Sequence, residues 1–150
     1  MYIRELQETE LDCFYNALKR SAMENGVGDR FQEKKLLQDA IFKEKHCSTL
    51  VVDIESNLVA YLLYSMTQRN FTLHRTPGFY IHSVYVDIPY RRRKIGTKLV
   101  EALVKKANER DFGRIEFALL QSNKIGDHFL ESLSFKEIDF IKPMRLTINK

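Results

Sequence analysis

Short runs of alternating or β-branched hydrophobic residues recur along the chain and predict seven β-strands. They cover Tyr2–Leu6, Ser48–Asp53, Leu58–Thr67, Gly78–Asp87, Arg114–Leu120, Phe135–Ile141 and Met144–Ile148. The polar turn Glu55–Asn57 lies between the second and third runs, so we expect these two strands to form a β-hairpin.

Hydrophobic residues at helical spacing predict four helices, Glu8–Met23, Gln32–Phe42, Ile95–Arg110 and Asn123–Leu133. The pattern is strongest in the third, where Ile95, Leu99 and Leu103 fall on one stripe. A loop at Asn25–Arg30 separates the first two helices, and its two glycines leave it free to wrap around a substrate. Strands and helices in this order predict a mixed α/β sheet covered by helices.

The length and composition fit one soluble domain. A chain of 150 residues can bury a core but is too short for two domains, so we expect a single domain over residues 1–150. The longest apolar stretch, Leu58–Leu63, is far shorter than the roughly 20 residues of a membrane-spanning helix. With no signal-peptide pattern, this predicts a cytoplasmic protein without a membrane partner. Cys13 and Cys47 lack metal-ligand spacing, so we expect buried, reduced thiols and no metal.

The excess of positive charge, +4 in total, is concentrated in the loop Arg91–Lys94. This loop leads directly into the helix that begins at about Ile95. Helix N-termini present unpaired N–H groups and the positive end of the helix dipole, so they hold phosphate groups. Gly96 lets an anion approach the backbone closely. The segment therefore predicts a site for a pyrophosphate or a phosphorylated cofactor. The alternatives are a solvated basic turn and a nuclear-localisation-like patch.

Two segments resemble motifs of the GNAT-type N-acetyltransferases. Arg91–Thr97 is similar to the family signature Arg/Gln-x-x-Gly-x-Gly/Ala, which follows the fourth strand. Asn123–Phe135 is similar to the downstream pattern Asn-x-x-Ala-x-x-Phe-Tyr-Glu-x-Leu-Gly-Phe. The resemblance covers nearly the whole chain. It implies an α/β (α+β) fold with a mixed, mostly antiparallel sheet of about seven strands, four flanking helices, and splayed fourth and fifth strands.

The resemblance also implies acetyl-coenzyme A (acetyl-CoA) as the acetyl donor, bound between the splayed strands, with backbone N–H groups around Val84–Val86 facing the oxyanion. The implied cofactor site comprises Val84, Tyr85, Val86, Arg91, Arg92, Arg93, Lys94, Ile95, Gly96, Thr97, Asn123 and Phe129. Asn123 also fits an ordinary helix cap, and Phe129 also fits the core. Loop lengths are most similar to those of the diamine (polyamine or thialysine) acetyltransferases, which implies a small amine acceptor and a homodimer built through the C-terminal strands.

The chain departs from the family pattern in three ways, which involve four residues. Lys94 replaces the first glycine of the signature, and Leu130 replaces the tyrosine that commonly protonates the leaving thiolate. His82 and Ser83 replace an acidic pair of the diamine acetyltransferases.

Acetyl transfer to an amine needs a group that takes a proton from the incoming ammonium. His82, with an ordinary pKa near 6.5, is the first candidate, and strand alternation places it on the face of Val84 and Val86. A hydrogen-bonded histidine within a sheet is the alternative. Tyr85 is a second candidate, as a hydroxyl donor to the thiolate. Candidates for binding the amine are Glu24, Asp29, His82 and Ser83, although surface charge explains the two carboxylates more simply.

Three functions compete. The favoured one is an acetyl-CoA-dependent N-acetyltransferase that moves the acetyl group directly to a primary amine of a small molecule, either a polyamine or a lysine-like compound. The second is a catalytically weak or inactive GNAT-like module that binds coenzyme A, because Leu130 cannot act as an acid. The third, nucleic-acid binding through Arg91–Lys94, is disfavoured because acidic residues such as Glu101 and Glu116 are interspersed along the chain.

Overall fold

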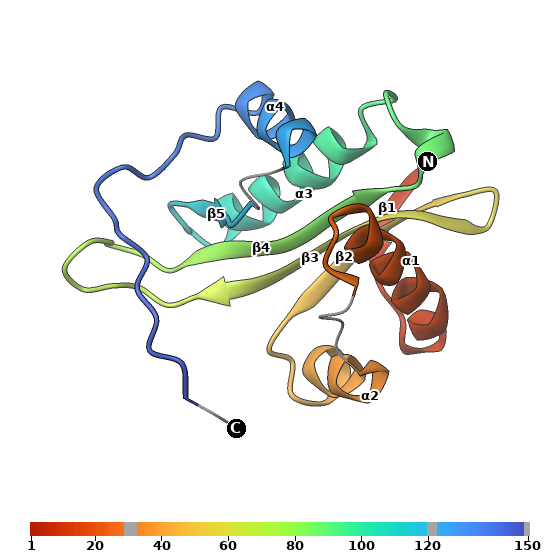
Figure 1. The fold of residues 1–150 in the computed structure, drawn as a ribbon, viewed down its shortest axis with the longest axis horizontal. Helices are drawn as coiled ribbons and strands as arrows, with labels where there is room; N and C mark the ends of the chain where they lie inside the picture. The colour runs from red at the N-terminus through yellow and green to blue at the C-terminus, as the bar shows by residue number, and fades with distance from the viewer. Residues whose placement is uncertain (29–32, 120–122, 149–150) are drawn as a thin grey trace. The chain divides into compact units, whose positions relative to one another are not determined.

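The computed structural model describes residues 1–28, 33–119 and 123–148. The chain divides into two compact units, Met1–Ala118 and Leu119–Lys150 (Figure 1). The single domain expected for residues 1–150 stays a prediction, and each unit is described by itself.

The first unit is built on a five-stranded sheet in the order β1-β2-β3-β4-β5 (Figure 1). Its strands are β1 (Tyr2–Glu5), β2 (Ser48–Ile54), β3 (Asn57–Thr67), β4 (Gly78–Val86) and β5 (Ile115–Phe117). Neighbours run antiparallel except β4 and β5, which are parallel. Glu55 and Ser56, with φ of 52° and 67°, form the tight turn between β2 and β3. The mixed, mostly antiparallel sheet and its hairpin are therefore confirmed.

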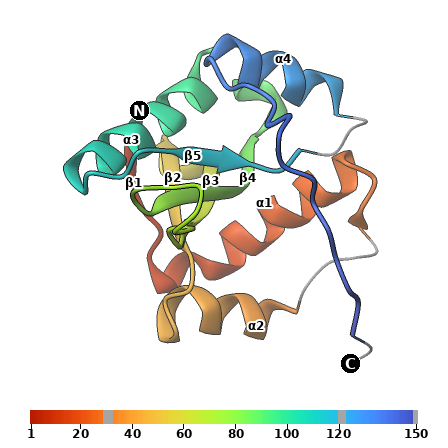
Figure 2. The ribbon, with the colours of Figure 1, turned by 90° about the vertical axis from the view of Figure 1, so that its left-hand side faces the viewer.

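Helices cover both faces of this sheet (Figure 2). On one face lie α1 (Leu11–Glu24), which follows the short 3-10 helix η1 (Glu8–Glu10), and α2 (Lys34–Gln38), which continues as the π-helical turn η3 (Asp39–Lys43). On the other face lies α3 (Ile95–Glu109), which follows β4 through the 3-10 helix η4 (Ile88–Tyr90). We call these the α1 face and the α3 face.

Each face is held by a hydrophobic core. On the α1 face the rings of Phe14 and Tyr61, both without exposed surface, meet edge-on with centroids 5.1 Å apart. On the α3 face, α3 buries the predicted stripe that includes Ile95, Leu99 and Leu103. Burial of each such side chain contributes about 1.5–3 kcal/mol. The helical spacing thus identified the inward side of α3 correctly.

Gly78, the first residue of β4, lies so close to the backbone before β5 that a side chain has no room. A Cβ added there would lie 2.7 Å from the carbonyl oxygen of Arg114, which accepts a hydrogen bond from Phe79 N–H. Gly78→Ala is therefore expected to lower the free energy of unfolding by about 1–3 kcal/mol. Thermal unfolding followed by circular dichroism would measure this loss. Gly28→Ala, where the nearest atom is the flexible Met23 Cγ at 3.2 Å, is the control. An equal melting temperature for the two variants would contradict the expectation.

The second unit contains α4 (Lys124–Ser132), so all four predicted helices are present. The two strands predicted at Phe135–Ile141 and Met144–Ile148 are wrong, since the described residues 133–148 form no strand. Hydrophobic residues there are exposed, with Phe140 at 75% and Leu146 at 87%. A strand-like pattern becomes a strand only when a neighbouring backbone pairs with it. The sheet therefore has five strands instead of about seven.

Two smaller observations concern the predicted core and the membrane. Cys13 is exposed rather than buried, whereas Cys47 is half-buried and its burial raises the pKa of its thiol. Across the described parts of the chain, none of the helices combines the length and the hydrophobicity that crossing a bilayer requires.

Candidate functional site

β4 loses its partner on one side half-way along its length. Its pairing with β5 covers Phe79–Ile81, opposite Ile115–Phe117. From His82 to Val86, none of the described residues forms a strand along this edge of β4. The splayed fourth and fifth strands expected from the sequence are thus present, and they leave backbone groups of β4 available at an open edge.

A β-bulge lies where the pairing with β5 ends. Leu63 pairs with Ser83, but the next residue of β3, Tyr64, pairs with Ile81. β4 therefore holds one extra residue, His82. Such a bulge re-aims side chains and shifts the alternation of all the residues that follow it.

The bulge turns His82 toward the α1 face. Its Nε2 lies 2.9 Å from the hydroxyl oxygen of Ser65, and its ring contacts the ring of Tyr80, with centroids 5.0 Å apart. Ser65 and Tyr80 are cross-strand partners on the α1 face, whereas Val84 and Val86 point to the α3 face. The expectation that His82 shares a face with these two valines is wrong, because strict alternation does not hold across a bulge.

His82 keeps the properties that the proposed proton transfer requires. The residue is exposed to solvent on the α1 face, so a substrate or a water molecule can reach it. Partial burial of the ring lowers the pKa of His82, because desolvation disfavours the charged imidazolium. The neutral, proton-accepting form therefore dominates at neutral pH.

Backbone N–H groups of Val84 and Val86 face the open edge. The N–H of Asp87 donates to the carbonyl of Val59 on β3, so by alternation the groups of Val84 and Val86 point away from β3. The carbonyl of Val86 accepts a hydrogen bond from Arg91 Nε, which lies outside the sheet. Unpaired N–H groups at a strand edge are suitable donors to an oxyanion.

Ser83 and Tyr85 also lie on the α1 face, where both contact the buried Tyr61. The hydroxyl of Tyr61 lies 2.9 Å from that of Ser83. Burial raises the pKa of Tyr61 to about 12, so this hydroxyl stays protonated and fixes the Ser83 side chain. Tyr85 is buried, with its ring 5.9 Å from that of Tyr61 and 5.5 Å from the guanidinium of Arg91.

The N-terminus of α3 has the features of an anion site. The first helical hydrogen bond runs from Lys98 N–H to Lys94 C=O, so the N–H groups of Ile95, Gly96 and Thr97 precede it. No side chain of the described residues caps this end. The side chains of the basic loop Arg91–Lys94 are exposed around it. The residues therefore fit the phosphate groups of a nucleotide-like cofactor.

Lys94 shows why the family signature has a glycine here. Its φ of 61° and ψ of 22° lie in the left-handed region, which a residue with a Cβ adopts at a cost of about 1 kcal/mol. Lys94→Gly is therefore expected to raise the free energy of unfolding by about 1 kcal/mol, or the melting temperature by about 2–4 °C. Calorimetry would measure the shift. A lower melting temperature would show that the Lys94 side chain stabilises the loop through contacts that outweigh its backbone strain.

Arg91, predicted to bind the cofactor, and Glu24, predicted to bind the amine, form an ion pair with each other. Arg91 Nη2 donates to both carboxylate oxygens of Glu24, each at 2.8 Å. A neighbouring ion pair, Arg20 with Asp87 at 3.0 Å, also joins α1 to the end of β4. The sequence analysis missed both pairs. Asp29, the other carboxylate predicted for the amine, lies outside the described residues.

The remaining predicted residues lie in the second unit. Asn123 accepts a hydrogen bond from Gly126 N–H at 2.8 Å, so it caps α4. Phe129 is half-buried, and Leu130, at the usual tyrosine position, is buried. Cofactor binding by Asn123 and Phe129 stays a prediction.

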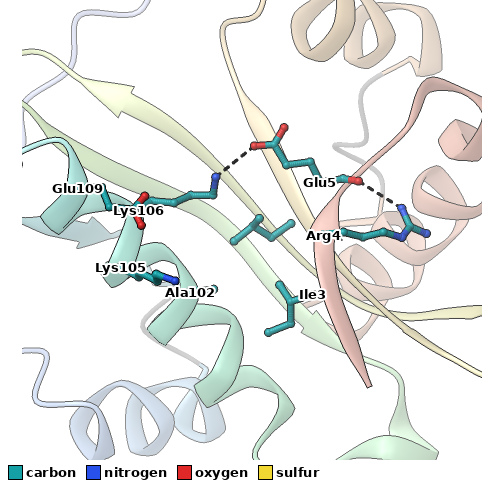
Figure 3. A pocket seen from close by; sticks show the side chains of 8 residues that line it. Ile3, Arg4, Glu5, Ala102, Lys105, Lys106 and Glu109 are labelled. Atoms are coloured by element: carbon teal, nitrogen blue, oxygen red, sulfur yellow. Dashed lines mark hydrogen bonds and ion pairs between the residues drawn. The ribbon is translucent and has the colours of Figure 1, made fainter.

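A hollow of about 290 Å³ on the α3 face lies away from the open edge of β4 (Figure 3). Its walls come from β1, Leu50 of β2 and α3, and β3 separates β2 from β4. Lys106 crosses it to Glu5 at 3.3 Å. Within the described ranges, no group of three or more His, Cys, Asp or Glu side chains could hold a metal ion.

The sequence pattern of the Acetyltransferase (GNAT) family matches residues 3–135, most of the chain. The chain belongs to the GNAT family. This membership confirms the predicted class of enzyme, an acetyl-CoA-dependent N-acetyltransferase, and the predicted acetyl donor.

Three proteins named as acetyltransferases are similar to the chain in sequence or in fold. It is 35% identical to L-ornithine N5-acetyltransferase of Arabidopsis thaliana over 63 residues, which are 40% of this chain and 28% of that protein. The ribosomal-protein-alanine N-acetyltransferase of Brucella melitensis biovar Abortus 2308 has a TM-score of 0.78 at 16% identity, covering 98% of this chain and 100% of that one. A predicted acetyltransferase with acetyl-CoA from Clostridium acetobutylicum has a TM-score of 0.80 at 16% identity, covering 96% and 95%. The two structures share the fold.

Proposed function

We propose that this GNAT protein transfers the acetyl group of acetyl-CoA directly to the primary amine of a small molecule, either a polyamine or a lysine-like compound. The observation that carries the proposal is the bulge in β4. It presents His82 on the α1 face, immediately before the open edge where the N–H groups of Val84 and Val86 lie.

This arrangement supports direct transfer because the two substrates can approach from opposite faces. The anion site at the start of α3 adjoins the α3 face, so the donor's phosphates are anchored there. His82 lies on the α1 face, where α1 and the start of its following loop are also found. The two faces meet at the open edge of β4, so no covalent acetyl-enzyme is needed.

The residues in this proposal have separate tasks. Bound acetyl-CoA supplies the thioester carbonyl. His82 takes a proton from the incoming ammonium, directly or through water, because an amine of pKa near 10 is protonated at neutral pH. The N–H groups of Val84 and Val86 stabilise the developing oxyanion. The neutral amine then attacks the thioester carbonyl, the C–S bond breaks, and the second proton of the nitrogen passes to solvent or to the departing thiolate. Leu130 is apolar and supplies no proton.

The choice of a small amine rests on the relative from Arabidopsis thaliana, whose name specifies the side-chain nitrogen of ornithine. A primary amine on a flexible chain is the group shared by ornithine, lysine analogues and polyamines. We also infer a homodimer in the cytoplasm. The exposed hydrophobic residues of the C-terminal segment, including Phe140 and Leu146, support an association between chains.

The test is release of free thiol from acetyl-CoA in the presence of single acceptors: ornithine, lysine, putrescine, spermidine and a peptide with a free N-terminus. We expect thiol release and acetylated product with at least one of the four small amines. The same reaction without any acceptor measures the background of hydrolysis. Activity with the peptide but with none of the four small amines would contradict the proposal that the acceptor is a small molecule. Binding of coenzyme A without release for any acceptor would favour the inactive module.

A further inference from the structure

The guanidinium of Arg91, the first cation of the basic loop, is already held by the protein. Its Nη2 donates to both oxygens of Glu24, the last residue of α1, and its Nε donates to the carbonyl of Val86, all at 2.8 Å. Its Cζ lies 5.5 Å from the centre of the Tyr85 ring. Arg91 therefore joins the end of α1 to the open edge of β4.

The rest of the basic loop is different. Arg92, Arg93 and Lys94 are exposed, and the described residues offer none of them an ion pair within 4.0 Å. These three side chains can turn toward a phosphate without breaking a bond to a carboxylate. Arg91 would first have to give up its ion pair with Glu24 and its hydrogen bond to the Val86 carbonyl. Hydrogen bonds in which a charged group takes part are stronger than those between neutral groups.

We propose that Arg91 is a positioning residue anchored by Glu24, and that it does not hold the phosphates of the cofactor. The proposal rests on the proposed function, since the group that Arg91 positions is the peptide edge assigned to the oxyanion. Arg91 acts through Val86, and Glu24 acts through Arg91.

The geometry explains how the effect reaches the oxyanion donors. The carbonyl of Val86 and the N–H of Asp87 belong to one planar peptide group. Arg91 holds the oxygen of that group, and the carbonyl of Val59 holds its N–H at 2.8 Å. With this plane fixed at both ends, the adjoining N–H of Val86 has a fixed direction at the open edge. Loss of Glu24 releases the guanidinium and hence one end of the plane.

The same contacts connect the two substrate sides. Glu24 is the last residue of α1 on the α1 face, whereas Arg91 begins the loop that leads to the N-terminus of α3. A change at the C-terminal end of α1 therefore alters the peptide edge through one ion pair. Such a change should alter the rate of the chemical step more than the affinity for the cofactor.

The decisive variant is Glu24→Gln, because the two roles of Arg91 predict opposite results for it. If Arg91 is a positioning residue, kcat falls about tenfold while the Kd for coenzyme A changes less than threefold. If Arg91 binds phosphate, removal of its competing carboxylate tightens coenzyme A binding. Asp12→Asn, which breaks the exposed ion pair of α1 with Lys34, makes the same change in charge and is the matched control.

Three measurements complete the experiment: calorimetry with coenzyme A, steady-state kinetics, and amide chemical shifts of Val86 and Asp87. We expect Glu24→Gln and Arg91→Lys to shift both amides and lower kcat, with near-normal affinity. Coenzyme A binding tighter than that of Asp12→Asn, unmoved amides, or an unchanged kcat would overturn the proposal. If no amine is acetylated, the proposed function fails, but calorimetry and the amide shifts still decide the role of Arg91.

Discussion

Replacing His82 by alanine is expected to lower kcat/KM for the amine by about 10²–10⁴-fold, the usual contribution of a general base. The bulge in β4 places this imidazole on the α1 face beside the open strand edge. Leu130 offers no acidic group, and the pKa of Tyr61, raised to about 12, keeps that hydroxyl protonated. His82 is therefore the described side chain at the bulge that can exchange a proton near neutral pH.

The pH profile separates this role from packing. A base works in its neutral form, so the rate falls as the pH drops through the pKa of His82. Because partial burial lowers this pKa, the acidic limb is expected below the ordinary value of about 6.5. In His82→Ala the limb should disappear together with the rate. Initial rates between pH 5 and pH 9 at subsaturating amine would measure both.

His128→Ala is the matched control, because His128 is an exposed histidine on α4 without an assigned role. We expect it to keep the normal rate and profile. His82→Ala with a full rate and an unshifted acidic limb would show that His82 only packs against Tyr80 and Ser65. Catalysis would then depend on the position of the two substrates alone.

Sequence patterns predicted correctly those elements whose structure is determined by residues close together in the sequence. The stripe of Ile95, Leu99 and Leu103 specified α3 and its buried side, and the polar turn at Glu55–Asn57 specified the hairpin. The basic loop and the helix start that follows it were also predictable, because the two are adjacent in sequence; that they bind an anion stays a prediction. The strained residue of this loop, Lys94, occupies the position where the family signature has glycine.

The bulge was missed although the sequence contains a trace of it. Phe79 and Ile81 occupy odd positions, whereas Val84 and Val86 occupy even ones. This change of phase around the polar residues His82–Ser83 is the mark of an extra residue, and it could have corrected the predicted face. Strict alternation, on which the predicted face of His82 depends, does not hold across this point.

Contacts between distant segments could not be predicted from local patterns. Glu24 and Arg91 lie 67 positions apart, and no local pattern specifies that a predicted substrate carboxylate and a predicted phosphate ligand bind each other. The prediction of two C-terminal strands was wrong for a related reason, because a strand forms only when a neighbouring backbone pairs with it. In both cases the local sequence does not specify which distant backbone or charged side chain lies next to the segment in the folded protein.

Gly96→Asp is expected to weaken the binding of acetyl-CoA by about tenfold or more. The added carboxylate would lie among the N–H groups at the start of α3, where the phosphates are proposed to bind. Close unit charges near a protein surface repel one another by about 1–4 kcal/mol, and 1.4 kcal/mol corresponds to about tenfold in Kd. Calorimetric titration with coenzyme A measures the loss without needing any acceptor amine.

The same substitution is expected to leave the fold intact or to stabilise it, and this makes the test specific. An aspartate in the first turn interacts favourably with the helix dipole by about 0.3–1 kcal/mol. Gly96→Ala adds a methyl group without charge and shows how much of the lost affinity is steric. A melting temperature that does not fall, with affinity lost in Gly96→Asp and largely kept in Gly96→Ala, places an anion at this helix end. Unchanged affinity in Gly96→Asp would mean that the phosphates bind elsewhere, because a carboxylate and a phosphate cannot share these N–H donors.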